Sequence, residues 1–91
     1  MEKEIKIPNN LNEAIKALDE ELVEEDKQYI LENGAISVHH SLGRWIRNNW
    51  GLWTSSELKN EIRRETGLFD ADDISNYIIK KYIKHLKDVN T

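Results

Sequence analysis

FDADDISNYIIKKYIKHLKD, residues 69–88, is the stretch that decides the fold. Asp70 belongs to the residue types that cap helix N-termini, and Asp72 and Asp73 follow in the first turn, where the helix dipole favours negative charge. Basic side chains gather toward the other end of the stretch: Lys80, Lys81, Lys84 and Lys87. The stretch therefore predicts one long helix with Asp70 as its N-cap.

The apolar side chains of this helix cover an unusually wide arc. At about 100° per residue they sweep over roughly two thirds of the helix circumference. They are Ile74, Tyr77, Ile78, Ile79, Tyr82, Ile83 and Leu86. An arc this wide occupies the centre of a bundle or places one edge in a subunit interface. Because additional burial stabilises small cores, we expect a homodimer or a higher homo-oligomer.

Two helices are expected in the N-terminal third of the chain. Asn10 and Glu13 have the spacing of a capping box. An apolar stripe follows at steps of three and four residues: Leu11, Ala14, Ile15, Leu18 and Leu22. A short second helix covers roughly residues 24–32 and ends at Asn33-Gly34, a pair that commonly terminates helices.

Two more helices lie between these and the last one. The third helix is expected from about Ser37 to Asn49. Thr54 and Glu57 have capping-box spacing, so a fourth helix should follow and run to about Thr66. No segment has the pattern of a paired strand. The fold class predicted is all-α, a single compact bundle of about five helices.

Composition describes a small globular domain. The chain has 91 residues, of which 38% are hydrophobic and 33% charged, so residues 1–91 should form one domain with a single modest core. Residues 1–9 contain Pro8, which prevents direct entry into a helix, and are expected to be a flexible or extended arm. The absence of cysteine excludes disulfides and thiolate metal sites. Without a signal-like or membrane-spanning segment, we expect a cytoplasmic protein with no membrane partner.

Charge argues against general nucleic-acid binding, which needs a basic surface. The net charge is −4. It is unevenly distributed, because residues 1–36 carry four lysines and ten acidic residues while residues 37–91 carry nine basic and seven acidic residues. The acidic third either forms solvated helix faces or masks the basic surface of a protein partner. A protein-interaction module, for example an inhibitor or an immunity-type protein, is therefore one functional hypothesis.

HHSLGRWIRNNWGLW, residues 39–53, carries the other hypothesis, because it gathers two histidines, two arginines, two asparagines and three tryptophans. On one continuous helix this segment would turn an apolar face around Leu42 toward the core. The opposite face would carry a cationic stripe of His40, Arg44 and Arg47. Gly43 lies beside this stripe, where its cost of about 1 kcal/mol relative to alanine would be offset by close approach of another backbone or of a ligand.

These residue types suit a small anionic, nucleotide-like ligand. Arginine offers a planar fork to phosphate, histidine a donor that titrates near neutral pH, indole a stacking face and asparagine an amide that reads a base edge. The candidate ligand-binding residues are His39, His40, Arg44, Arg47, Asn48, Trp50 and Trp53. A non-enzymatic module that sequesters a cyclic-nucleotide-type immune signal would fit this description.

Structural explanations compete with this interpretation. The tryptophans, Trp45 included, would equally serve the core or an interface. The asparagines that precede Gly51 would bond free carbonyls at the helix end. Arg44 and Arg47 would pair with the acidic N-terminal third, each surface pair contributing about 0–1 kcal/mol.

Catalytic and metal sites are not expected. His39 and His40 are adjacent, so on a helix they point about 100° apart and cannot readily chelate one metal ion. Their spacing to His85 fits no standard ligand pattern. Ser37 and Ser41 have no accompanying oxyanion-hole motif. We therefore predict no enzyme activity, no metal and no cofactor.

The chain resembles a group of small bacterial and phage proteins classed as a domain of unknown function. Three stretches carry the resemblance: LNEAIKALDEEL with the following EEDK, HHSLGRWIRNNWGLW, and FDADDISNYIIKKYIKHL. The matching positions are His39, Leu42, Gly43, Ile46, Arg47, Asn48, Gly51, Leu52, Trp53, Asp72, Asp73 and Ser75. The resemblance implies no known activity, but it adds Ser75 to the candidate residues. Ser75 falls inside the apolar arc of the last helix, where its hydroxyl needs a partner that Arg47 or Asn48 could supply.

Overall fold

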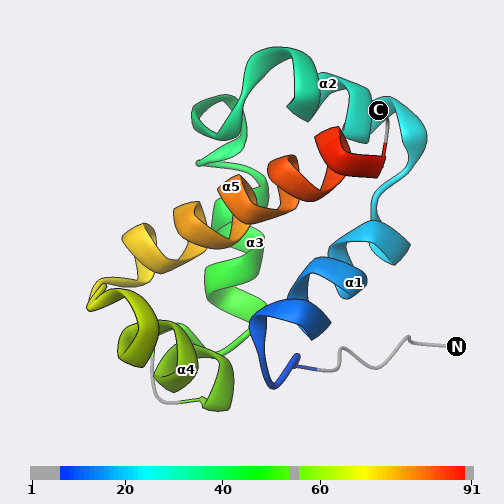
Figure 1. The fold of residues 1–91 in the computed structure, drawn as a ribbon. Coiled ribbons are helices and arrows are strands. Elements are labelled where there is room, and N and C mark those ends of the chain that lie inside the picture. Colours follow the sequence, from blue (N-terminus) through cyan, green and yellow to red (C-terminus); the bar gives the residue numbers. More distant parts are fainter. Residues whose placement is uncertain (1–6, 54–55, 90–91) are drawn as a thin grey trace, which may run out of the picture.

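The computed structural model describes residues 7–53 and 56–89. Within these residues all regular secondary structure is helical, and there are no strands. Its elements follow in the order α1 (Leu11–Glu21), α2 (Glu24–Asn33), the 3₁₀ helix η1 (Ala35–Val38), α3 (Leu42–Asn49), α4 (Glu57–Thr66) and α5 (Ala71–Val89) (Figure 1). The predicted all-α bundle of about five helices is confirmed.

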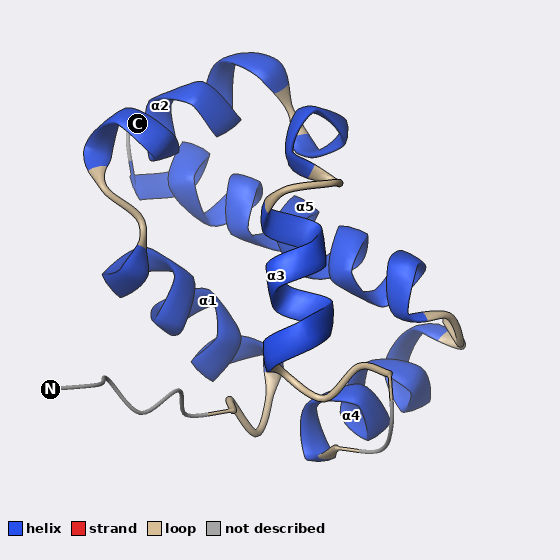
Figure 2. Cartoon of the chain, turned by 180° about the vertical axis from the view of Figure 1, so that it is seen from behind, coloured by secondary structure: helices blue, strands red, loops and turns tan. Residues whose placement is uncertain are grey.

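Helix α5 is the centre of the bundle. It contacts α1, α2, η1 and α3, whereas α4 packs against α1. Figures 1 and 2 show α5 spanning the molecule, with α2 over one end and α4 near the other. Its buried side chains are Ala71, Ile74, Ser75, Ile78, Ile79, Tyr82 and Leu86. The wide apolar arc therefore reflects a central position within one chain, and the homo-oligomer stays a prediction that the arc no longer supports.

Local capping explains where the helices begin. The Asn10 side chain accepts a hydrogen bond from the backbone N–H of Glu13 at 2.9 Å, which confirms the predicted start of α1. The Glu13 carboxylate accepts in return from the N–H of Asn9 at 3.2 Å. At α4 the cap is Ser56, which accepts from the N–H of Lys59 at 3.2 Å. Helix α4 thus begins at Glu57, and the expected cap Thr54 lies outside the described residues.

Of the expected N-terminal arm, residues 1–6 lie outside the described residues. The described remainder is a short non-helical segment in which Pro8 is buried.

The predicted continuous helix from Ser37 to Asn49 is wrong. The chain forms the 3₁₀ helix η1, turns over residues 39–41, and begins a new helix at Leu42. The Ser41 hydroxyl donates to the carbonyl of Val38 at 3.4 Å, a local bond of the kind that competes with helix continuation. The break also leaves the carbonyl of His39 free to accept a side-chain hydrogen bond.

The break changes which face of α3 is buried. The buried residues are Gly43, Ile46, Arg47 and Trp50, at steps of three and four. Leu42 and Trp45, expected at the middle of the apolar face, are only partly buried and pack at its edge. Arg47 was predicted to face away from the core and instead lies within it, so that part of the helical-wheel prediction is wrong.

Candidate functional site

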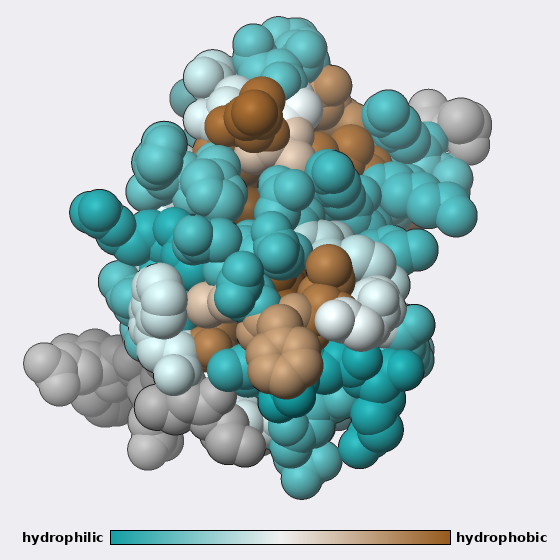
Figure 3. All heavy atoms as spheres, turned by 90° about the vertical axis from the view of Figure 1, so that its left-hand side faces the viewer, coloured by the Kyte–Doolittle hydropathy of each residue, from teal (hydrophilic) through white to brown (hydrophobic). Residues whose placement is uncertain are grey.

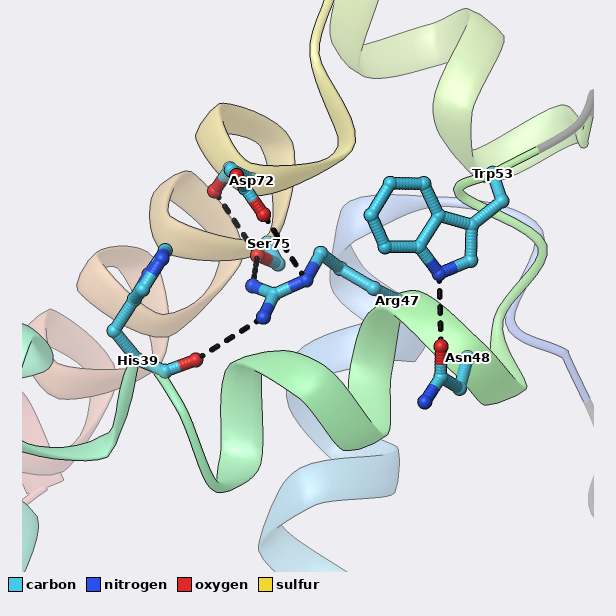
Figure 4. Close-up of polar contacts among 6 residues, drawn as sticks. All are labelled: His39, Arg47, Asn48, Trp53, Asp72 and Ser75. Carbon is cyan, nitrogen blue, oxygen red and sulfur yellow. Dashed lines mark hydrogen bonds and ion pairs between the residues drawn. The ribbon is translucent and has the colours of Figure 1, made fainter.

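Arg47 lies at the junction of α3, α5 and the turn after η1 (Figure 4). Its side chain is 6% exposed, and all three of its guanidinium nitrogens have partners. Nε lies 3.1 Å from a carboxylate oxygen of Asp72, and Nη1 donates to the Ser75 hydroxyl at 2.9 Å. Nη2 donates to the backbone carbonyl of His39 at 3.4 Å. The buried charge is therefore neutralised and hydrogen-bonded within the chain.

Gly43 makes room for this guanidinium. A Cβ atom built at position 43 would lie 2.9 Å from Nη1 of Arg47 and 3.7 Å from both the Ser75 hydroxyl and the carbonyl of Val38. The nearest group is a side chain of the same helix, whereas the sequence suggested another backbone or a ligand. The groups that approach are a side chain one helical turn away, the Ser75 hydroxyl and the backbone of η1.

Ser75 has the partner that its position in the apolar arc required. Its hydroxyl accepts from Arg47 and donates to the carbonyl of Asp72 at 3.0 Å, so both of its hydrogen-bonding functions are used. Asn48, the alternative partner, bonds elsewhere. Within the described residues, no buried side-chain nitrogen or oxygen is left without a partner.

The acid that neutralises Arg47 comes from the last helix. Asp72 stands in the first turn of α5 with its side chain 61% exposed, so the pair joins a buried cation to a carboxylate at the surface. The hypothesis that Arg47 pairs with the acidic N-terminal third is wrong.

The predicted cationic stripe is thereby divided. His40 and Arg44 are exposed, whereas His39 is half-buried with its ring in edge-to-face contact with that of His40 at 5.2 Å. Arg44 forms no ion pair with any residue that the structure describes. Of the three residues of the stripe, Arg47 is therefore buried, and only His40 and Arg44 have their side chains at the surface.

The tryptophans are divided as well. Trp50 is 1% exposed and packs edge-to-face on Trp45 with ring centroids 5.6 Å apart, so it belongs to the core. Trp53 is 61% exposed and donates its indole N–H to the side-chain oxygen of Asn48 at 2.8 Å. The Asn49 amide donates to the carbonyl of Trp45 at 2.8 Å, the helix-end role expected for these asparagines.

Residues 7–86 match the family described as "Domain of unknown function (DUF6794)". The chain belongs to this family. Comparison with curated proteins gives no match, and comparison with solved structures gives none either. The family match spans the whole Arg47 arrangement and supports the unit of structure, while its description carries no activity.

The described part of the DUF6794 chain contains neither a candidate cluster of metal ligands nor a candidate membrane-spanning helix. No three of its histidine and acidic side chains are placed so that they could hold a metal ion. None of its helices combines the length and the apolar character that crossing a membrane requires.

One groove of the DUF6794 domain lies between α2 and the segment that leads into α3, and neither Arg47 nor its side-chain partners Asp72 and Ser75 line it. This groove has a volume of about 550 Å³ and is lined by Leu22, Asp26, Tyr29, Ile30, Ser37, Val38, Ser41 and Leu42. Sequence reasoning missed it, because it depends on the break before α3. One signal was available: Tyr29 is a large aromatic residue within an otherwise acidic helix, and it is half exposed.

Proposed function

We propose that the DUF6794 domain is a non-enzymatic protein-interaction module of the cytoplasm. Its groove between α2 and the start of α3 would bind a basic amphipathic helix of a partner protein. The observation that carries this proposal is the combination of an apolar floor with an acidic rim. Leu22, Ile30, Val38 and Leu42 provide the floor, and the side chain of Asp26 stands among them.

The rim of the groove continues into a strongly acidic surface. Tyr29 lines both the groove and a neighbouring depression formed by Glu24, Glu25, Gln28 and Glu32 of the same helix. The one lysine of α2, Lys27, lies 3.3 Å from Asp19 and 3.8 Å from Glu24, so its charge is already engaged. Complementary charge would steer a basic segment to this face and fix its orientation.

Two exposed apolar residues that adjoin lining residues of the groove in sequence support the same occupant. Ile36 in η1 is 85% exposed, and Val23, just before α2, is 62% exposed. Large apolar side chains at the surface near a concave apolar floor are typical of recognition sites. An amphipathic helix would cover them with its apolar face and place its lysines or arginines against the carboxylates of α2.

Selection of peptides provides the test, because the partner need not be known. A displayed library of random helical peptides is selected against the folded domain. We expect the enriched peptides to combine lysine or arginine with leucine or isoleucine at helical spacing. Reversing Glu25 and Asp26 to lysine should weaken their binding at least about tenfold, which corresponds to about 1.4 kcal/mol.

The matched control reverses Glu65, an exposed acid of α4 far from the groove, and should leave binding unchanged. No enrichment, enrichment of acidic peptides, or equal sensitivity to the two reversals would refute the proposal.

The small-anion hypothesis stays a prediction for the exposed part of the 39–53 cluster. Arg47 is engaged by Asp72, which leaves His40 and Arg44 as the candidate contacts for a nucleotide-like ligand. Arg44 supports this reading because no acid of the described chain pairs with it. Calorimetric titration with mononucleotides and cyclic dinucleotides tests the hypothesis: binding should weaken in Arg44→Ala, and a panel without any binding would end it.

A further inference from the structure

We propose that the domain has a second binding site, at the corner where α4 leads into α5, and that it takes a mononucleotide-like ligand with one phosphate and one planar ring. The site is a shallow pocket of about 390 Å³ lined by Asn60, Arg63, Arg64, Gly67 and Phe69. It is independent of the groove between α2 and α3, and it lies outside the 39–53 cluster.

Helical spacing brings the polar groups of the pocket together. Asn60, Arg63, Arg64 and Gly67 follow at steps of three and four residues, so they share one face of α4. The opposite face of this helix is buried through Leu58 and Ile62. Gly67 ends α4 in a left-handed conformation with φ of 77°, which turns the chain back and carries Phe69 to the edge of the pocket.

The two arginines are not neutralised within the described residues. Neither Arg63 nor Arg64 has an ion pair there, in contrast to buried Arg47. The carboxylate of Glu61, the nearest acid on α4 toward the N-terminus, accepts a hydrogen bond from the backbone of Leu11 at 2.8 Å and is thus directed toward α1. The pocket therefore presents two guanidinium groups, whose planar forks match phosphate oxygens.

The exposed ring of Phe69 distinguishes this pocket from an ordinary basic helix C-terminus. Basic side chains in the last turn of a helix are expected from its dipole, a contribution of about 0.3–1 kcal/mol. The dipole does not explain an aromatic side chain that is 68% exposed beside them. The Arg63 guanidinium carbon lies 3.9 Å from the centroid of the Phe69 ring, so the two planar groups form a stacked platform.

These groups divide the recognition of one ligand among them. A planar base stacks on the Arg63–Phe69 platform, the Arg64 fork holds the phosphate, and the Asn60 amide bonds the edge of the base. The volume lies within the range of small-ligand pockets, about 300–1,000 Å³, at its lower end. Figure 3, which views the side of the molecule where α4 lies, shows hydrophobic side chains in separate patches surrounded by hydrophilic ones. A small pocket with one aromatic residue suits a single nucleotide better than an extended chain.

The test is a titration of the isotope-labelled full chain, followed by NMR, with AMP, GMP, CMP and UMP as probes. We expect saturable shifts in the backbone signals of Asn60, Arg64 and Phe69 in the wild-type chain. Inorganic phosphate alone and adenosine alone should each bind at least about tenfold more weakly than AMP, because each engages only part of the site.

Variants locate the site independently of the shifts. Arg64→Ala and Phe69→Ala change exposed side chains, so both should keep the thermal midpoint of the wild type and lose at least about tenfold in affinity. Lys84→Ala is the matched control, an exposed cation on α5, and should bind normally. The double reversal of Glu25 and Asp26 should also bind normally, which separates this site from the groove.

Three results would overturn the inference. They are an absence of saturable binding, inorganic phosphate binding as tightly as AMP, and unchanged affinity in Arg64→Ala and Phe69→Ala. Loss of binding in Arg44→Ala alone would assign the nucleotide to the 39–53 cluster and equally refute a site on α4.

Discussion

Gly43, which has no side chain, and the buried guanidinium of Arg47 belong to one packing arrangement. The space that a Cβ would occupy is taken by Nη1 of Arg47, which in turn holds the hydroxyl of Ser75. Two residues that looked like separate features, a glycine in a helix and a serine in an apolar arc, therefore have one cause. Both accommodate the charge of Arg47 inside a small core.

Gly43→Ala should destabilise the domain by about 1–3 kcal/mol, although alanine is the better helix former by about 1 kcal/mol. The added methyl group would stand 2.9 Å from Nη1 and force the guanidinium away from its acceptors. Urea unfolding followed by circular dichroism measures the change. Arg44→Ala, at an exposed position of the same helix, should stay within about 0.5 kcal/mol of the wild type. An equally or more stable Gly43→Ala protein would contradict the packing described.

Removing the acid of the ion pair should cost more than removing the base. Asp72→Ala leaves the buried Arg47 charge without a counter-ion, at about 2–3 kcal/mol. Arg47→Met leaves no buried charge: the Asp72 carboxylate is solvated, the Ser75 hydroxyl still donates to the Asp72 carbonyl, and the uncharged His39 carbonyl loses one donor. Asp73→Ala controls for the loss of negative charge from the first turn of α5. The free energies of unfolding of the three variants are compared. A smaller loss of stability in Asp72→Ala than in Arg47→Met would contradict the role of Asp72 as the counter-ion of a buried charge.

At the scale of elements, local chemistry was predictable and long-range contact was not. Asn10 and Glu13 correctly predicted the start of α1, and the apolar arc of residues 74–86 correctly predicted the central helix. Both predictions were possible because capping and periodicity depend only on neighbours in sequence. The turn at residues 39–41 was missed. The His39 carbonyl in this turn accepts a hydrogen bond from Arg47, eight residues later. A helical wheel drawn through the turn places Arg47 on the exposed face, although it places Arg44 there correctly.

The candidate site shows the same limit. The need of Ser75 for a partner followed from its position in the arc, and Arg47 is that partner. The groove could not be predicted, since its two walls meet only after the chain has turned between η1 and α3. Exposed Phe69 beside two arginines is visible in the sequence only once the end of α4 is fixed at Gly67.

Helices α1, α2 and α5 are joined by two polar contacts that share Asp19, and one of them predicts a dependence on alkaline pH. The Tyr82 phenol donates to the Asp19 carboxylate at 3.1 Å, and Asp19 also pairs with Lys27. Burial, together with this hydrogen bond and the nearby negative charge, raises the pKa of Tyr82 above its ordinary value of about 10. The folded state thus favours the protonated phenol, so its contribution is complete below about pH 10 and is lost as the pH rises further.

Unfolding free energies measured between pH 8 and 11 should therefore fall more steeply for the wild type than for Tyr82→Phe. At neutral pH the variant should be less stable by about 1 kcal/mol, the usual net value of one hydrogen bond. Tyr29→Phe, which changes an exposed tyrosine, serves as the control. Parallel pH profiles for the wild type and Tyr82→Phe would contradict the role given to burial.

At the scale of the whole molecule, the central helix makes the described part of the chain one cooperative unit. Helix α5 contacts α1, α2, η1 and α3, so each of these loses part of its packing surface once α5 is lost. Thermal unfolding should show a single transition, with the same midpoint by far-UV circular dichroism and by tryptophan fluorescence. Separate midpoints would mean that a part of the bundle melts on its own.

The contact between Gly43 and Arg47 also constrains how this sequence can change over time. A side chain at position 43 is accommodated with less cost after the guanidinium has gone, and loss of the guanidinium removes the reason for a glycine in α3. The two positions should therefore be exchanged together among members of the family, in the order arginine first and glycine second. Substitution at positions 43 and 47 is therefore constrained by their shared packing. The exposed side chains of His40, in the turn before α3, and Arg44, on α3, are under no such packing constraint.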